Sequence, residues 1–234
     1  MDIKEIDTKY IQARKQLLEY KIKDNALISK AITFFNQYYN LVEHPFTLED
    51  VEKLASIDFS IKMDFLHWFT INPKTEAEVS KFYRYTPFEF FKNLLKNMDI
   101  MHYQILGENI LPELKKAKCK TVLDYGGGSG YLAMMLDKLD FKVTFSELNK
   151  ISLDWMKHIT KEDNLDIDIF DLQENKIEQT YDAIVIKDVL EHLTEPQVVL
   201  DMLSKYTNNL IIIPDKINKE EDYLPMHFSY EIKQ

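Results

Sequence analysis

The sequence is poor in cysteine and in positive charge, and it has no long hydrophobic run. Its single cysteine, Cys119, excludes an internal disulfide and suits a reducing compartment, so we expect a cytoplasmic protein. Lysine and arginine total 29 against 39 aspartates and glutamates, a net charge of −10 that argues against duplex nucleic-acid binding. No apolar stretch approaches the roughly 20 residues of a membrane span, and the charged start lacks a secretory signal.

Glycine is also scarce, and its distribution singles out one loop. Four of the five glycines are Gly126, Gly127, Gly128 and Gly130. Glycine allows a positive φ and lets the backbone approach another group closely. We therefore look for the function of the protein in this loop.

The remaining composition is that of an ordinary globular protein, with 45% hydrophobic and 29% charged residues among 234. Residues 1–118 carry apolar side chains at helical spacing, and we expect an all-helical lid and substrate-binding region there. Residues 119–234 alternate short apolar runs with amphipathic helices. We expect them to form a second domain, which binds the ligand of the glycine loop.

Capping residues mark several helix starts in the first half. A capping box is expected at 75–78 and a stronger one, with proline at the first helical position, at 86–89; residues 47–50 resemble another start. Phenylalanine and tyrosine are dense between residues 34 and 103. Packing between helices accounts for most of these rings, but Tyr83, Arg84 and Tyr85 are also candidates to line a pocket over the glycine loop.

The second half predicts five strands, at 121–125, 141–145, 166–170, 183–186 and 209–213. Helical patterns separate them, so the connections are right-handed crossovers and the strands run parallel. The expected fold is α/β, a doubly wound Rossmann-like and mostly parallel sheet that is shortened at the C-terminus.

The glycine loop follows the first of these strands. Its backbone N–H groups and the start of the next helix should lie beside a ligand at the carboxyl ends of the strands. The dinucleotide fingerprint would need a third glycine at position 131, which is Tyr131, so a nicotinamide oxidoreductase is a weaker alternative. A phosphate-binding P-loop is also excluded, because the loop does not end in Gly-Lys-Ser/Thr.

The pattern Asp-x-Gly-x-Gly-x-Gly at 124–130, with Glu147 ending the second strand and Asp171 following the third, resembles the class I S-adenosylmethionine-dependent methyltransferases. The resemblance spans roughly residues 105–230 and includes the run 181–193 around the fourth strand. It implies that Asp124 organises the loop beneath the methionine part of the cofactor. It also implies that Glu147 holds the ribose hydroxyls and that Asp171 meets the adenine amino group. The expected cofactor-binding residues are Asp124, Tyr125, Gly126, Gly127, Gly128, Glu147, Leu148, Asp171, Leu172, Lys187 and Asp188.

Two histidines are candidates for a catalytic base. His192 lies four residues after Asp188, so in a helix the two would share a face and the carboxylate would support an imidazolium. His227 follows the fifth strand, also on the ligand side. Either histidine could instead only pack locally, and methylation of an amine needs no strong base. No metal site is expected, because the six histidines lack metal-ligand spacing.

These residues predict an S-adenosylmethionine-dependent methyltransferase that acts on a small molecule by in-line methyl transfer. The alternative is a non-catalytic protein that keeps the cofactor pocket for regulation or assembly. Only 21 residues follow Ile213. Either the domain is naturally short, or the chain has been cut, or a second copy or another partner covers the short edge of the sheet.

Overall fold

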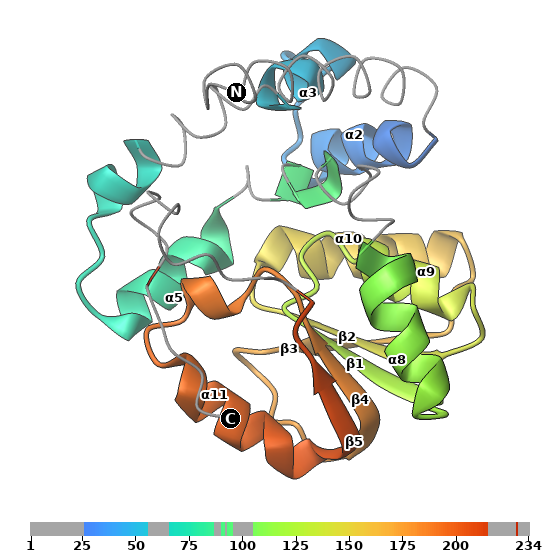
Figure 1. Cartoon of the computed structure of the whole chain (residues 1–234). Helices are drawn as coiled ribbons and strands as arrows, with labels where there is room; N and C mark the ends of the chain where they lie inside the picture. Colours follow the sequence, from blue (N-terminus) through green and yellow to red (C-terminus); the bar gives the residue numbers. More distant parts are fainter. Residues whose placement is uncertain are drawn as a thin grey trace, which may run out of the picture.

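The computed structural model describes residues 26–55, 66–86, 90, 91, 93–95, 105–214 and 228. Within the first half these residues form helices, as the apolar spacing predicts (Figure 1). These elements are α2 (Ala26–Tyr38), α3 (Leu48–Ala55), α5 (Glu76–Tyr85), the π-helix η1 (Ile105–Ile110) and α8 (Leu111–Lys116).

Local capping chemistry fixes the start of α5. The side chain of Thr75 accepts a hydrogen bond from the Glu78 backbone N–H at 3.3 Å, and the Glu78 carboxylate accepts from the Thr75 N–H at 3.0 Å. The capping box predicted at 75–78 is therefore confirmed. Thr86 ends α5, and the rest of the box predicted at 86–89 lies outside the described residues.

The second half is a five-stranded parallel sheet with the order β3-β2-β1-β4-β5. This confirms the predicted doubly wound α/β fold; β1 has the predicted bounds, and the ends of the other strands differ from the expected ones by at most two residues. The strands are β1 (Thr121–Tyr125), β2 (Lys142–Glu147), β3 (Ile167–Asp171), β4 (Tyr181–Ile186) and β5 (Thr207–Ile212). Between them lie α9 (Tyr131–Asp137), α10 (Lys150–Glu162), η2 (Leu190–His192), α11 (Pro196–Leu203) and η3 (Ser204–Tyr206).

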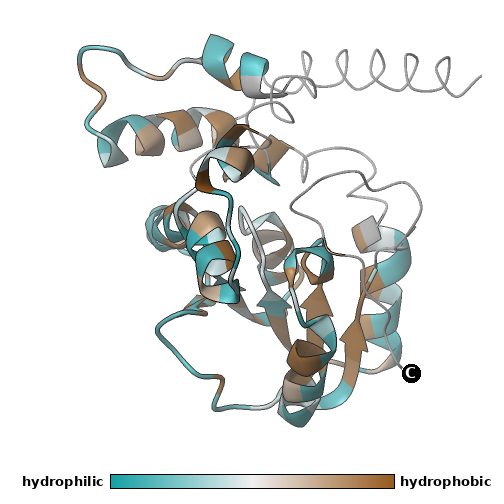
Figure 2. Cartoon of the chain, turned by 90° about the vertical axis from the view of Figure 1, so that its left-hand side faces the viewer, coloured by the Kyte–Doolittle hydropathy of each residue, from teal (hydrophilic) through white to brown (hydrophobic). Residues whose placement is uncertain are grey.

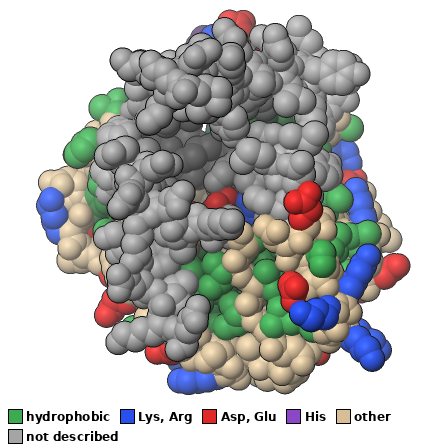
Figure 3. Space-filling view, viewed as in Figure 1, with side chains coloured by type: hydrophobic (Ala, Val, Ile, Leu, Met, Phe, Trp, Pro, Cys, Tyr) green, Lys and Arg blue, Asp and Glu red, His purple; other side chains and the backbone are tan. Residues whose placement is uncertain are grey.

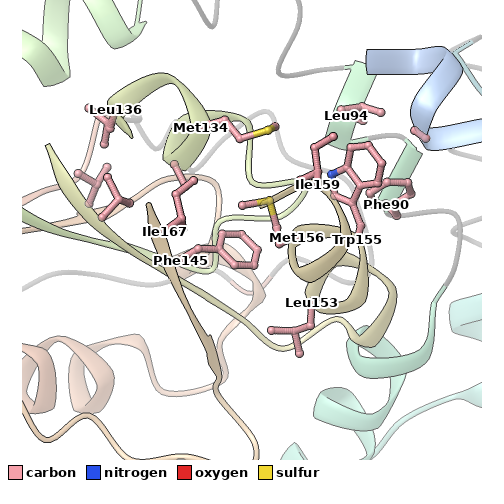
Figure 4. Packing of buried hydrophobic residues seen from close by; sticks show 14 of the residues in the cluster. Phe90, Leu94, Met134, Leu136, Phe145, Leu153, Trp155, Met156, Ile159 and Ile167 are labelled. Atoms are coloured by element: carbon pink, nitrogen blue, oxygen red, sulfur yellow. The ribbon is translucent and has the colours of Figure 1, made fainter. Parts of the chain in front are cut away.

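Alternate side chains of each strand point to opposite faces of the sheet. Helices cover both faces, so the sheet has a separate hydrophobic core on each side. Val122 of β1 belongs to the core shared with α2, α9 and α10, whereas its neighbour Leu123 belongs to the core shared with α11. Figure 2 shows the strands as mostly hydrophobic elements inside more polar helices. Figure 4 shows part of the first core, where Trp155 of α10 packs near Phe90.

The strand order reverses direction at β1, which has β2 on one side and β4 on the other. The chain passes from β1 to β2 and β3 on one side and then crosses to β4 and β5 on the other, so the carboxyl ends of β1 and β4 border a crevice. The loop from 126 to 130 follows β1 directly. The fold therefore puts the glycine loop at the place where open α/β sheets bind their ligands.

Candidate functional site

The glycine loop is a sharp bend in which Gly126, Gly128 and Gly130 have φ values of 70°, 59° and 75°. A Cβ on Gly130 would collide with the side chain of Met156, so this position combines a left-handed backbone with close packing against α10. A Cβ on Gly127 would lie 2.5 Å from Oδ2 of Asp124. The loop can therefore reach the buried carboxylate and α10 only because glycine occupies these positions.

The amides of the loop are hydrogen-bonded within the protein. Those of Gly126 and Gly127 both donate to the Ser146 carbonyl, at 2.9 and 3.0 Å, and that of Gly130 donates to the Gly127 carbonyl at 2.9 Å. The Gly128 amide donates to Glu147 Oε2 at 2.6 Å. All four loop amides therefore have acceptors within the protein, three of them on β2 and the fourth, that of Gly130, within the loop itself. The expectation that these N–H groups lie beside a ligand stays a prediction.

Glu147 stands at the end of β2, where the sequence places the ribose-binding acid. Its other oxygen, Oε1, accepts from the Leu148 and Asn149 amides at 2.6 and 2.8 Å. Backbone donors from two loops therefore hold this carboxylate in one orientation. A carboxylate oxygen can accept more than one hydrogen bond, so this fixed group can still receive hydroxyl donors from a ligand.

Asp124, in β1, is only 2% exposed. Among the described residues, no donor lies within hydrogen-bond reach of its Oδ2. Burial, with a smaller contribution from the negative charge of Glu147, raises the pKa of Asp124 to about 7, although Lys187 acts in the opposite direction. A buried carboxylate with an unpartnered oxygen is costly, and such groups concentrate at functional sites.

A cleft lies beside this carboxylate and opens to solvent. The empty space along its lining, open solvent included, is about 390 Å³. Lys187 Nζ and Asp188 Oδ2 lie 2.7 Å apart on its wall. The lining residues are Asn93, Asp124, Gly126, Gly127, Gly128, Leu132, Lys187 and Asp188. Asn93 was not among the expected residues, because nothing in the sequence distinguishes it from the other polar positions of a helical stretch.

Asp171 ends β3, and an arginine of the helical region reaches it. Arg84 Nη1 donates to Asp171 Oδ1 at 2.6 Å, and the Gln173 amide donates to the same oxygen at 3.0 Å. Burial alone would raise the pKa of Asp171, but these hydrogen bonds and the charge of Arg84 outweigh it and lower that pKa.

The residue after Asp171, Leu172, donates its amide to the Glu147 carbonyl at 3.0 Å and packs at the edge of the second core. Tyr125, buried in that same core, points to the side of the sheet away from Asp124.

The proposed pairing of Asp188 with His192 rests on a helix that does not form. Asp188 has a φ of 53°, and only the short 3₁₀ turn Leu190–His192 follows it. His192 Nδ1 instead lies 2.9 Å from the hydroxyl of Tyr83, in α5. The other candidate base, His227, lies outside the described residues.

Other kinds of site find no support in the described part of the chain. No group of three or more histidine, cysteine, aspartate or glutamate side chains there could hold a metal ion. None of the helices in those segments is both long and apolar enough to cross a membrane. Acidic and basic side chains are interspersed over the described surface of the face shown in Figure 3.

Fold and site together define a class of protein. It is a doubly wound α/β protein whose cleft offers carboxylates rather than backbone N–H groups. Such a cleft suits hydroxyl donors and positive charge, whereas a phosphate would meet Asp124, Asp188 and the nearby Glu147.

Residues 98–213 match the family described as "Methyltransferase domain". With the parallel sheet and the glycine loop, this match shows that the chain carries a class I S-adenosylmethionine-dependent methyltransferase domain. The cofactor of this family is S-adenosylmethionine. No curated protein is significantly similar to the chain in sequence.

Several solved structures are similar in fold. Magnesium protoporphyrin IX methyltransferase (ChlM) from Synechocystis PCC 6803, solved with bound SAH, has 17% identity and a TM-score of 0.45, over 67% of this chain and 68% of that one. TehB from Haemophilus influenzae has 26% identity and a TM-score of 0.40, over 53% of this chain and 44% of that one. Coclaurine N-methyltransferase, bound to N-methylheliamine and SAH, has 16% identity and a TM-score of 0.43, over 79% and 63%. The chain thus spans less than half of TehB and about two thirds of the other two.

The residues of the cleft fit this cofactor chemically. S-adenosylmethionine carries a positive sulfonium, an ammonium and a ribose diol, and each of these groups is favoured by carboxylates. The unpartnered oxygen of Asp124 and the fixed carboxylate of Glu147 are acceptors of the required kind. The residues present therefore fit the cofactor.

Proposed function

We propose that this protein is an S-adenosylmethionine-dependent methyltransferase that methylates a small molecule by in-line transfer. The observation that carries the proposal is the acidic cleft at the end of β1, where Asp124 and Asp188 face only one lysine, Lys187, among the lining residues described. Because Lys187 balances Asp188, the cleft is net negative when Asp124 is ionised. This charge stabilises a cationic cofactor more than its neutral demethylated product, S-adenosylhomocysteine (SAH).

In this proposal Glu147 receives the two ribose hydroxyls and Asp171 receives the adenine amino group. The glycine loop, with Leu148, Leu172 and the ends of β1 and β4, shapes the cleft around the rest of the cofactor. When bound, the cofactor supplies an electrophilic methyl group on sulfur. The protein then has mainly to orient the acceptor in line with that methyl group, and orientation of this kind can contribute on the order of 7–11 kcal/mol.

The acceptor side of the proposed site is the junction between α5 and the turn after β4. His192 is part of this junction and is 2.9 Å from the Tyr83 hydroxyl. If the acceptor is a hydroxyl, the His192 imidazole can take its proton, and Tyr83 orients the ring by holding Nδ1. His227 stays a second candidate for this role.

We further propose that residues 1–118 act as the lid and choose the acceptor. The support is that α5 contacts the ends of β3 and β4 through its side chains. Aromatic residues of this region gather beside the junction: Trp68 and Phe82 pack with Tyr83 in one apolar cluster, which Phe228 joins from the other end of the chain. Such a cluster favours an acceptor with apolar or aromatic surface over a charged polymer.

We also propose a cytoplasmic location and a second copy of the chain at the edge of the sheet.

Two measurements test the function. Calorimetry with S-adenosylmethionine and SAH should give saturable binding by the full chain, and absent binding at millimolar ligand would overturn the proposal. Incubation with methyl-labelled cofactor and fractionated cell extract then separates an enzyme from a non-catalytic cofactor-binding protein. Label in a low-molecular-mass product supports the enzyme, whereas binding without any labelled product supports the alternative.

A further inference from the structure

Arg84 is the most deeply buried charged side chain of the described helical region, with 4% of its surface exposed. It lies in the last turn of α5, which otherwise exposes a large part of its surface. Burying an arginine costs free energy unless its charge is paired and its N–H groups are hydrogen-bonded. The partners of Arg84 therefore indicate why it is there.

Those partners belong to the loops on the β2–β3 side of the sheet. Besides the 2.6 Å bond to Asp171 Oδ1, Arg84 Nη1 donates to the Leu148 carbonyl at 3.1 Å. Its Nη2 lies 3.4 Å from Glu174, which is largely exposed and contributes little. One planar guanidinium thus joins the end of β3 to the loop after β2.

Asn149 fastens the same end of α5 by a second route. Its side-chain N–H group donates to the Tyr83 carbonyl at 2.8 Å and to the Thr86 carbonyl at 2.9 Å. Its side-chain oxygen caps α10 by accepting from the Ser152 amide at 3.1 Å. The Asn149 side chain, two residues after Glu147, therefore holds the end of α5 independently of Arg84.

We infer that Arg84 is a positioning residue that orients Asp171 for the nucleobase, so that selection of adenine depends on the docking of α5. This inference rests on the proposed function, because it takes Asp171 to face the nucleobase. A carboxylate that is fixed and ionised accepts from the amino group of adenine and repels the carbonyl oxygen that hypoxanthine has in its place. A carboxylate that can rotate or protonate distinguishes the two less well, since a protonated acid can itself donate.

The inference requires reciprocal coupling. If docking of α5 improves cofactor binding through Asp171, then cofactor binding must stabilise the docked α5 by the same free energy. A purely structural arginine would change the stability of the fold without changing the choice between nucleobases. Nucleobase selectivity is therefore the decisive measurement.

The test compares Arg84→Gln and Arg84→Lys with the wild-type full chain, using SAH and its deaminated analogue S-inosylhomocysteine in calorimetry at pH 7. Wild type should bind SAH much more tightly. Arg84→Gln should reduce this preference by about tenfold or more, which corresponds to losing the orientation of one charge-assisted hydrogen bond. Arg84→Lys should give an intermediate value, since it keeps the charge but loses the planar fork.

Lys30→Gln is the matched control. Lys30 of α2 forms ion pairs with Asp163 and Glu162 near the end of α10, so it also links the helical region to the second domain, but away from the site. The nucleobase preference should not change in this variant. In wild type, hydrogen exchange should show that SAH protects the amides of residues 76–86, and that Arg84→Gln diminishes this protection.

The outcomes separate the two proposals. If wild type binds neither ligand, the proposed function fails. If wild type selects SAH and Arg84→Gln selects it equally, the inference about Arg84 is overturned while the function stands. Should Arg84→Gln fail to fold, Arg84→Lys and the exchange protection of wild type carry the same decision, and an unchanged preference with no protection of α5 overturns the inference.

Discussion

The hydroxyl of Tyr83 lies 2.9 Å from Nδ1 of His192, although the two residues are 109 positions apart. Their rings also contact, with centroids 5.0 Å apart. This contact joins α5 to the turn after β4, where the proposed methyl transfer takes place.

Removal of the imidazole should therefore slow methyl transfer without loss of the cofactor. We expect His192→Asn to lower kcat by about 10²–10⁴ for a hydroxyl acceptor, the range for a lost general base. Tyr83→Phe should lower it less, since it removes only the hydroxyl that orients the ring. Stopped assays with labelled cofactor give kcat, and calorimetry should give unchanged SAH affinity. Full activity of His192→Asn would show that the reaction needs no base at this position.

The second prediction concerns the ribose-binding acid. Glu147→Ala removes the acceptor of three backbone amides as well as the proposed acceptor of the diol. Since each charge-assisted hydrogen bond contributes about 1.5–3 kcal/mol, SAH should bind at least tenfold more weakly. The control is Glu162→Ala, which makes the same change of charge at an exposed position of α10. Equal affinities of the two variants in calorimetry would contradict the role of Glu147.

The third prediction concerns pH. The pKa of Asp124 is raised from 3.8 to about 7 in the folded protein, so folding favours its protonated form. The protonated Asp124 carboxyl contributes fully to the stability of the folded state below pH 3.8, and this contribution is lost as the pH rises through about 7. The loss amounts to on the order of 4 kcal/mol, at 1.36 kcal/mol per pKa unit.

Asp124→Asn should remove this dependence, because an amide of the same shape does not titrate. Relative to wild type, the variant should gain free energy of unfolding between pH 5 and pH 8, measured by urea denaturation at both values. It should also lose much of the preference for S-adenosylmethionine over SAH, since a negative charge near the sulfonium is gone. Parallel pH profiles of the two proteins would contradict the raised pKa.

The fourth prediction concerns the glycine loop. Gly130→Ala forces a side chain onto a φ of 75° and into Met156. Strain and overpacking of this kind together cost about 2–4 kcal/mol, which should lower the melting temperature by several degrees or more. Gly107→Ala is the control, because a Cβ there has nothing within 4 Å among the described atoms and φ is not positive. Equal melting temperatures of the two variants would show that the loop tolerates a side chain.

The sequence predicts well the features that nearby residues decide. The strands are recognisable because their apolar character follows from burial on both faces, and the capping box at 75–78 because its two hydrogen bonds span only three positions. The position of the glycine loop follows from the strand before it. The helix on which a pairing of Asp188 with His192 depends does not form, because the chain bends at Asp188 after β4, and no periodicity marks such a bend.

The order of strands and helices, the glycine loop and the acids that end β2 and β3 were thus determined by the sequence alone, because each depends on burial or backbone geometry within a few residues. Only the tertiary structure decided that β2 takes the loop amides, that Arg84 pairs with Asp171 across 87 positions, and that Tyr83 meets His192. Those pairings depend on where α5 packs against the sheet. Packing of this kind is set by side-chain contacts distributed over the whole fold, and no local pattern encodes it.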